Sequence, residues 1–237
     1  MLEILFEDSS CLAVNKPAGL STQLPPRIDS LERHVREWLG RQAAAGGEHA
    51  SDIYLGLPHR LDRPVSGVIL FAKTRRAARL ISRQFERRQV RKIYWACVAG
   101  AVDPPEGTWI DFVRKVPDEP RVEIVAAVAP GAQQAVLHYR TLAPATVANK
   151  PFTWLEIELE TGRMHQIRIQ AASRGHPVIG DALYGAATQF GPETADPRER
   201  AIALHARTLT IRHPEKNELL TLTAPLPATW QALELAG

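Results

Sequence analysis

The sequence has few cysteines and no apolar run long enough to span a bilayer. Its two cysteines, Cys11 and Cys97, are too far apart in the chain for the paired spacing of a zinc site. Both lie in apolar, strand-like segments, so we expect two buried free thiols in a reducing compartment. The N-terminal residues carry acids where a signal peptide carries bases. These absences predict a cytoplasmic protein that contacts no membrane.

Several catalytic motifs are also missing. There is no glycine-rich dinucleotide or phosphate loop, and the segment Val65-Ser66-Gly67 lacks the first glycine of a hydrolase nucleophile elbow. No two of the eight histidines have the i, i+4 spacing of a zinc-binding helix. We therefore expect no metal, although ligands can converge from distant segments.

The overall composition is that of an ordinary globular protein. Hydrophobic residues make up 45% of the 237 residues and charged residues 23%. This length suits one large domain with a substantial core, so we predict a single domain over residues 1–237. The net charge of +3 is small, and its distribution along the chain is uneven.

The segment from Arg75 to Lys92 holds eight basic residues and one acid. On a helix, four of its arginines share one face, while apolar side chains occupy the opposite face. The four are Arg76, Arg79, Arg83 and Arg87. Most charge runs are solvated helix faces, but arginines without matching acids are also typical of a surface that binds the phosphates of a nucleic acid.

Hydrophobic periodicity predicts more strands than helices. We expect an N-terminal hairpin from Leu2 to Val14, helices over 31–39 and 164–172, and loops over 42–52 and 186–200. Further strands are predicted over 65–71, 92–100, 121–125, 135–141 and 154–160, with a last hairpin formed by 204–211 and 219–222. Because several strands are linked as hairpins, the fold class is α+β on a mainly antiparallel sheet.

One carboxylate, Asp62, stands out because it lies between Arg60 and Arg63 just before the apolar segment Val68–Ala72. That segment is a predicted buried strand, and loops at strand ends commonly carry functional residues. An ionised, well-positioned aspartate can act as a nucleophile, a base or a metal ligand. The alternative is a surface turn in which Asp62 pairs with a neighbouring arginine.

Other polar residues also fall beside predicted strand ends. Tyr94 lies in one strand, and a turn after Glu160 precedes the last predicted helix. The polar residues of this turn and of the helix start are Arg163, His165, Gln166 and Arg168. A helix N-terminus adds positive potential, so a carboxylate near Arg168 would be stabilised as the anion. Asp62 is the candidate for that carboxylate.

These segments together resemble the RNA pseudouridine synthases of the RluA type. The resemblance runs from about Leu2 to about Pro225 and rests on ordered motifs rather than on one short match. The main motifs are His59-Arg60-Leu61-Asp62 with Ser66-Gly67, then Lys92 and Tyr94 with Val98 and Gly100, then Thr161 to Arg168. Further agreement comes from Asn15-Lys16-Pro17-Ala18-Gly19, His176-Pro177, Gly180-Asp181, Tyr184-Gly185 and Leu204-His205-Ala206. Position 65 departs from the family, with valine in place of the usual threonine.

The resemblance implies a pseudouridine synthase fold, with a mixed sheet flanked by helices and loops and a catalytic cleft along the sheet. It implies an isomerase that needs no cofactor and converts uridine to pseudouridine in structured RNA, either rRNA or tRNA. Asp62 would be the nucleophile, Arg168 its ionic partner, and Tyr94 a stacking platform for the uracil. We expect no separate N-terminal RNA-binding domain, and a monomer.

The target uridine would flip out of its stack to reach Asp62, and Arg60 or His59 would fill the gap. The predicted RNA contacts are His59, Arg60, Arg63, Arg163, His165, Gln166 and the four helix arginines. Two other functions remain open. A non-catalytic RNA-binding module would need no aspartate, and a glycosidic hydrolase would need a second carboxylate, for which Asp181 is the candidate.

Overall fold

The structure is a computed structural model that describes residues 2–25, 28–45, 53–147 and 150–233. Its strands follow from alternating apolar and polar residues. In the strand that ends at Leu159, Leu155, Ile157 and Leu159 are buried, while the intervening glutamates are partly exposed. This strand is the clearest case in which the pattern of the sequence sets the buried face of the sheet.

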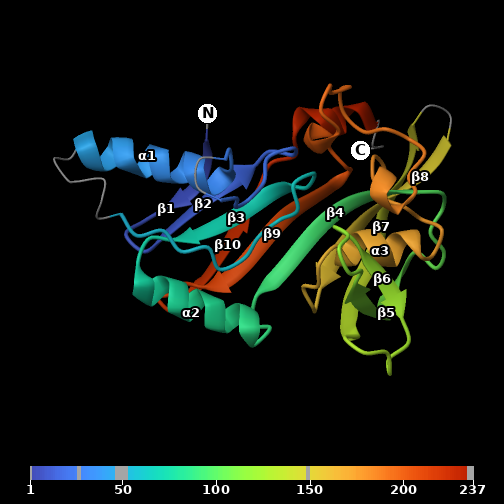
Figure 1. The fold of residues 1–237 in the computed structure, drawn as a ribbon, viewed down its shortest axis with the longest axis horizontal. Coiled ribbons are helices and arrows are strands. Elements are labelled where there is room, and N and C mark those ends of the chain that lie inside the picture. The colour runs from blue at the N-terminus through green and yellow to red at the C-terminus, as the bar shows by residue number, and fades with distance from the viewer. Residues whose placement is uncertain (1, 26–27, 46–52, 148–149, 234–237) are drawn as a thin grey trace.

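The strands of the described chain form one sheet of ten (Figure 1). They are β1 (Glu3–Glu7), β2 (Cys11–Lys16), β3 (Ser66–Ala72), β4 (Arg91–Ala99), β5 (Glu106–Lys115), β6 (Val122–Val125), β7 (Gln133–Val147), β8 (Lys150–Leu159), β9 (Leu204–Arg212) and β10 (Leu219–Thr223). Their order is β1-β2-β3-β9-β4-β8-β7-β5-β6, and β10 pairs with β9. Only β3 and β9 pair in parallel among these strands, which confirms the predicted mainly antiparallel, mixed sheet.

Helices and short 3-10 turns cover the sheet. Helix α1 (Leu31–Ala45) buries Leu31, Val35 and Leu39, and α2 (Arg75–Glu86) packs along β3 and β9. Helix α3 (Gln166–Ala172) packs against β5 and β6. The 3-10 turns are η2 (Ala182–Tyr184), η3 (Pro197–Glu199) and η4 (Ala228–Leu233).

Several predicted boundaries were wrong. Helix α1 continues to Ala45, so residues 42–45 are helical rather than loop, and residues 46–52 lie outside the described chain. Alanines 43–45 have the highest helix propensity, which explains the extension. Helix α3 begins at Gln166 rather than Met164, because His165 has a left-handed backbone (φ 51°) that cannot belong to the helix.

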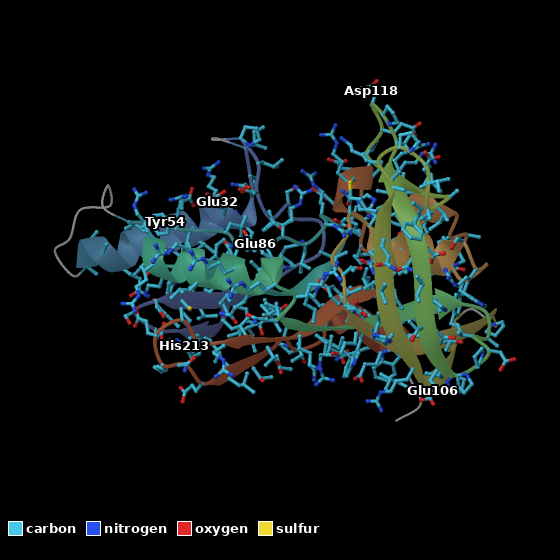
Figure 2. The ribbon with its side chains drawn as sticks, turned by 90° about the horizontal axis from the view of Figure 1, so that it is seen from below. Glu32, Tyr54, Glu86, Glu106, Asp118 and His213 are labelled. Atoms are coloured by element: carbon cyan, nitrogen blue, oxygen red, sulfur yellow. The ribbon has the colours of Figure 1, made fainter. Side chains whose placement is uncertain are left out.

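Strand β5 was not predicted from the sequence. This strand pairs with β7 on one side and with β6 on the other. Figure 2 shows it as a long strand, with Glu106 at one end and Asp118 in the turn at the other. Its first residues, Glu106 and Gly107, have low strand propensity, and the pairing with β7 makes them part of the strand.

Both cysteines are buried free thiols, as predicted. Cys97 lies on β4, and burial raises the pKa of its thiol to about 12, so it stays protonated. Among the described residues, no helix is both long enough and apolar enough to cross a membrane.

Candidate active site

Asp62 lies on a loop that the chain near residues 16–22 holds in place. The Thr22 hydroxyl donates to the Leu61 carbonyl (2.8 Å) and accepts from the Leu61 amide (3.1 Å). On the other side of Asp62, the Arg63 carbonyl accepts from the Gly19 amide (2.9 Å) and from Lys16 Nζ (3.1 Å). The backbone is therefore fixed on both sides of the carboxylate.

Lys16 is fully buried, and its ammonium also donates to the carbonyls of Pro17 (2.8 Å) and Leu20 (2.6 Å). An ammonium has three N–H donors, and the three carbonyl acceptors, with that of Arg63, match them. Burial lowers the pKa of Lys16 to about 7, and the nearby negative charge of Asp62 opposes that shift. Lys16 thus ties the N-terminal segment to the Asp62 loop.

Strand β3 begins at Ser66, just after this loop, and passes very close to β9. A Cβ on Gly67 would lie 2.3 Å from the Ala206 carbonyl oxygen, and the residue has φ +121°. Only glycine fits this backbone and this approach. The neighbouring Ser66 Oγ lies 2.8 Å from His205 Nδ1, so side chains add to the parallel contact between the two strands.

Arg168 lies between two carboxylates. Its guanidinium makes a bidentate pair with Asp181, with distances of 2.6 Å (Nε to Oδ2) and 2.8 Å (Nη2 to Oδ1). Its Nη1 donates to Asp62 Oδ2 at 3.2 Å. Arg168 and Asp181 are 4% and 2% exposed, whereas the Asp62 side chain is 27% exposed. The predicted pairing of Arg168 with Asp62 is therefore present, and Asp181 fixes the arginine that makes it.

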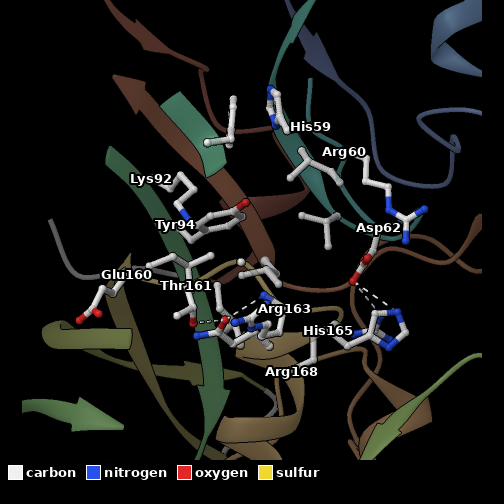
Figure 3. Close-up of a pocket in the computed structure, with 18 of the residues that line it drawn as sticks. His59, Arg60, Asp62, Lys92, Tyr94, Glu160, Thr161, Arg163, His165 and Arg168 are labelled. Atoms are coloured by element: carbon white, nitrogen blue, oxygen red, sulfur yellow. Dashed lines mark hydrogen bonds and ion pairs between the residues drawn. The ribbon is translucent and has the colours of Figure 1, made fainter. Parts of the chain in front are cut away.

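His165 approaches the same carboxylate from the end of the turn before α3. Its Nε2 lies 3.5 Å from Asp62 Oδ2, and its Nδ1 lies 2.8 Å from the Tyr184 hydroxyl. Burial lowers the pKa of His165, so the imidazole is predominantly neutral at physiological pH. Arg168 Nη1 and His165 Nε2 both face Oδ2, and Figure 3 shows the Asp62 carboxylate at the pocket with His165 beside it.

Asp62 lines a cavity of about 530 Å³ whose walls also include Tyr94, Lys92 and Arg163. Tyr94 and Lys92 are two residues apart on β4 and so point to the same face of the sheet. Figure 3 shows these two side chains on one wall of the pocket and Asp62 on the other. The cavity lies within the size range of small-molecule sites.

The pocket shifts the pKa values of both β4 residues. Burial, together with the negative charge of Asp62, raises the pKa of Tyr94, so its phenol stays protonated at neutral pH. Burial lowers the pKa of Lys92 to about 8, and the positive charges of Arg88 and Arg163 add to this effect. A protonated phenol beside an ammonium suits stacking and anion binding better than proton abstraction.

Two of the predicted RNA contacts use their polar atoms within the protein. The His59 ring stacks on Phe85 (4.9 Å between centroids), and its Nε2 accepts from the Leu70 amide (3.0 Å). Burial lowers the pKa of His59 to about 3, so the ring is neutral. Gln166 is buried and hydrogen-bonds with Thr161 (2.7 Å) and the Val136 carbonyl (3.0 Å), which shapes the turn before α3. Both line the pocket, and their RNA-binding role stays a prediction.

The three loop arginines differ in position. Arg60 is exposed and lines the pocket, and Arg163 lines it while donating from Nε to the Gln134 carbonyl (3.0 Å). Arg63 donates to Ser21 (2.8 Å) and is not among the residues that line this cavity. Within the described chain, neither Arg60 nor Arg63 forms an ion pair with Asp62, so the surface-turn alternative does not apply.

The predicted helix with an arginine stripe is α2. Thr74 caps its N-terminus, and Ala77 and Ile81 are buried beneath it. The arginine stripe, defined as Arg76, Arg79, Arg83 and Arg87, is exposed, and the structure gives it no ion pair among the residues described. Figure 2 shows the surface of α2 with Glu86, its one acid, at the C-terminal end.

Four residues of this site were not among the predicted site residues: Lys16, Lys92, Asp181 and Tyr184. Lys92 had the clearest signal, because strand alternation already places it on the same face as Tyr94. Asp181 was considered as the acid of a hydrolase, but its bidentate pair with Arg168 leaves no free carboxyl oxygen for that role. No local pattern indicates that Lys16 reaches the Asp62 loop or that Tyr184 reaches His165.

A separate cluster of Asp8, Cys11 and His213 has the residue types of a metal site. Its polar atoms already bond one another. His213 Nε2 lies 2.8 Å from Asp8 Oδ2, and its Nδ1 accepts from the amides of Glu215 and Lys216. Neither ring nitrogen has a lone pair left for a cation. The prediction that the chain binds no metal stays a prediction.

Comparison with known proteins identifies the family to which this chain belongs. The sequence profile described as RNA pseudouridylate synthase matches residues 10–173. The chain belongs to this family. It is 33% identical to tRNA pseudouridine synthase C of Yersinia pestis, over 98% of this chain and 90% of that protein. It is 35% identical to ribosomal large subunit pseudouridine synthase D of Nitrosomonas europaea, over 98% of this chain and 64% of that protein.

The fold agrees with the family. A solved structure, human RNA pseudouridylate synthase domain containing 1, superposes with a TM-score of 0.76 at 24% identity, covering 98% of this chain and 86% of that chain. This likeness confirms the predicted fold, and the family confirms the predicted enzyme class, an isomerase. The single domain, the monomeric state and the cytoplasmic location stay predictions.

Proposed function

We propose that this protein converts uridine to pseudouridine in a structured tRNA or rRNA, with Asp62 as the nucleophile. The observation that carries the proposal is the position of Asp62. Its carboxylate faces a pocket of about 530 Å³, and Arg168 holds one of its oxygens while Asp181 holds Arg168. A carboxylate held in this way is oriented and accessible, as a nucleophile must be.

The proposed reaction neither oxidises nor reduces its substrate. The bond between ribose C1′ and uracil N1 breaks, the uracil turns over, and a bond forms between C1′ and C5. The C5 proton leaves and N1 gains a proton, so the atoms balance without a cofactor. The Asp62 carboxylate can add to ribose C1′ as the bond to N1 breaks, or it can add to the base. In either case the bond to Asp62 breaks again before the product leaves, so the carboxylate is regenerated. A carboxylate next to C1′ also stabilises positive charge that develops on the sugar.

Tyr94 is the proposed stacking platform for the turned uracil. Its ring lines the pocket opposite Asp62, and its raised pKa makes it a poor base at neutral pH. The target uridine has to leave its base stack to reach this pocket. Arg60, exposed at the pocket, is the proposed residue that fills the gap in the RNA.

A non-catalytic RNA-binding module on the same fold is the second candidate, and we disfavour it. A protein that only binds phosphate gains nothing from a carboxylate in its pocket, since the like charges repel. Here the carboxylate is retained together with a buried counter-charge and a tyrosine on the facing wall.

The test is the Asp62→Asn variant, assayed over a single turnover. We expect pseudouridine formation to be abolished while RNA binding stays within a few-fold, because the amide keeps the shape and loses the nucleophile. The substrate would come from mapping pseudouridines in total RNA from cells with and without the protein. Substantial turnover by the Asn variant on that substrate would overturn the role of Asp62.

A further inference from the structure

A chain of polar contacts leads from an edge strand of the sheet to the Asp62 carboxylate. The Val122 amide, at the start of β6, donates to the Tyr184 hydroxyl oxygen at 3.0 Å. The same hydroxyl is hydrogen-bonded to His165 Nδ1 at 2.8 Å, and His165 Nε2 lies 3.5 Å from Asp62 Oδ2. Tyr184 is not among the residues that line the pocket, and its hydroxyl is connected to Asp62 by way of His165.

This chain favours one position for the imidazole proton of His165. The Tyr184 oxygen accepts the Val122 amide, and its own hydrogen is available to donate. Among the described residues, His165 Nδ1 is the only acceptor that the structure places within hydrogen-bond distance of that hydroxyl. Burial raises the pKa of Tyr184, so the phenol is protonated and can donate. When the phenol donates to Nδ1, the remaining imidazole proton of neutral His165 is on Nε2, which faces Asp62 Oδ2.

The position of the His165 imidazole proton decides whether Nε2 attracts or repels the Asp62 carboxylate. Arg168 Nη1 donates to Oδ2 of Asp62 at 3.2 Å, and in the Nε2–H tautomer the imidazole proton of His165 also points toward that oxygen, from 3.5 Å. The structure gives no hydrogen bond from a described side chain to Oδ1. In the other tautomer, the Nε2 lone pair would face Oδ2, and the two acceptors would repel each other.

We propose that Tyr184 is a positioning residue that holds His165 in its Nε2–H tautomer, so that His165 and Arg168 fix Oδ2 and leave Oδ1 of Asp62 to attack. The proposal rests on the proposed role of Asp62 as nucleophile. It assigns the two carboxyl oxygens of Asp62 different roles, one held and one reactive. It also gives the edge strand β6 a part in arranging the active site.

The first test reads the tautomer directly, without any RNA. The 15N resonances of the His165 ring in the labelled free protein, assigned by comparison with His165→Gln, report which nitrogen is protonated. We expect an unprotonated Nδ1 and a protonated Nε2 in the wild type, and a mixture of tautomers in Tyr184→Phe. A wild type that is protonated at Nδ1, or a Tyr184→Phe spectrum identical to that of the wild type, would overturn the proposal.

The Tyr184→Phe variant removes little besides the hydroxyl. The Arg168 guanidinium lies over the Tyr184 ring, 5.1 Å from its centroid, and phenylalanine keeps that contact. We expect its single-turnover rate to fall on the order of tenfold, within the range of coupling between contacting residues, with RNA affinity unchanged. An unchanged rate would contradict the proposal.

The second test separates positioning from a structural role of Tyr184. A glutamine at position 165 can place an amide N–H where Nε2 lies, without help from Tyr184, whereas asparagine reaches only the position of Nδ1. We expect His165→Gln to retain more activity than His165→Asn. Adding Tyr184→Phe to His165→Gln should lower the rate no further. A further tenfold loss in the double variant would show that Tyr184 acts through stability of the fold.

The two tests also separate this proposal from the proposed function. If Asp62→Asn remained active, the nucleophile assignment would fail whatever the His165 tautomer. If Asp62→Asn were inactive and Tyr184→Phe kept both the wild-type tautomer and the wild-type rate, only the role of Tyr184 would fail.

Discussion

The charges around Asp62 and the charges on α2 are arranged in opposite ways. At Asp62, the carboxylate is matched by Arg168, which is itself matched by Asp181, and the last two side chains are almost fully buried. On α2, the arginine stripe is exposed and has no ion pair within the described chain. The comparison shows that the charges of one region are matched within the protein, whereas those of the other are left free for a polyanionic partner, as our proposal of an RNA substrate requires.

Dielectric environment explains why the two arrangements differ. A buried charge without a partner costs several kcal/mol, so the inner cluster has to be complete within the protein. An exposed arginine is solvated by water and pays little for having no partner. A binding surface can therefore keep its charges free, whereas a catalytic carboxylate in a pocket needs its partners built in.

Breaking the inner cluster at its centre should have the largest effect. We expect Arg168→Met to lower the single-turnover rate by about 100-fold or more, because Asp62 loses the donor that orients it. Arg168→Lys keeps the positive charge but cannot pair in bidentate fashion with Asp181 and also reach Asp62. It should therefore be nearly as inactive as Arg168→Met. If lysine restored most of the activity, charge alone would suffice and the geometry would not matter.

The outer partner of the cluster should affect stability. Asp181→Asn leaves the guanidinium of Arg168 buried without a full counter-charge, and we expect the free energy of unfolding to fall by roughly 3–5 kcal/mol. The matched control is Arg76→Ala on α2, which should change it by less than about 0.5 kcal/mol. Urea denaturation of the three proteins measures both. Equal effects of the two variants would remove the contrast between the regions.

Local sequence patterns predicted the exposed face of α2, whereas they could not predict the contacts around Asp62. The helical spacing of Arg76, Arg79, Arg83 and Arg87 was enough to place them on one exposed face, because a helix is a local structure. The pairing of Arg168 with Asp62 came from family resemblance, since the two residues are 106 positions apart and no local pattern relates them. The same holds for Lys16, which reaches the Asp62 loop only after β2 and β3 have paired.

The features that were missed also depend on contacts between distant segments of the chain. Strand β5 begins with residues of low strand propensity, and its position is set by β6 and β7 on its two sides. The contacts of His59 could not be predicted either, because they come from distant segments: its ring stacks on Phe85, and its Nε2 accepts from the Leu70 amide. Local patterns predict faces and elements, and contacts between distant segments decide what each side chain does.

Removing the arginine stripe should weaken binding and leave the chemistry intact. Each lost phosphate contact lowers the slope of log K against log salt by roughly 0.7 to 0.9. We expect the fourfold alanine variant at Arg76, Arg79, Arg83 and Arg87 to show a flatter salt dependence, with an unchanged single-turnover rate at saturating protein. Affinity measured over a range of potassium chloride concentrations gives both slopes. Identical slopes would mean that the RNA does not lie along α2.

Lys92 shares a feature with each of the two regions. It lines the pocket, as Asp62 does, but like the arginine stripe it has no ion pair among the described residues. Its pKa of about 8 means that it is mostly charged at pH 7 and mostly neutral at pH 9. His59 also lines the pocket and, with a pKa of about 3, stays neutral over this range. If Lys92 binds a phosphate or a carbonyl oxygen of the RNA, affinity should fall as pH rises through about 8.

The matched control is Lys92→Arg, which stays charged at both pH values. We expect the wild type to lose several-fold in affinity between pH 7 and pH 9, and Lys92→Arg to lose less, because a lysine of lowered pKa loses its proton first. Lys92→Met should bind more weakly at pH 7 and resemble the wild type at pH 9. Equal pH dependence of all three proteins would exclude a charged contact from Lys92 and would leave the arginines of the pocket, Arg60 and Arg163, as the cations that can contact the RNA there.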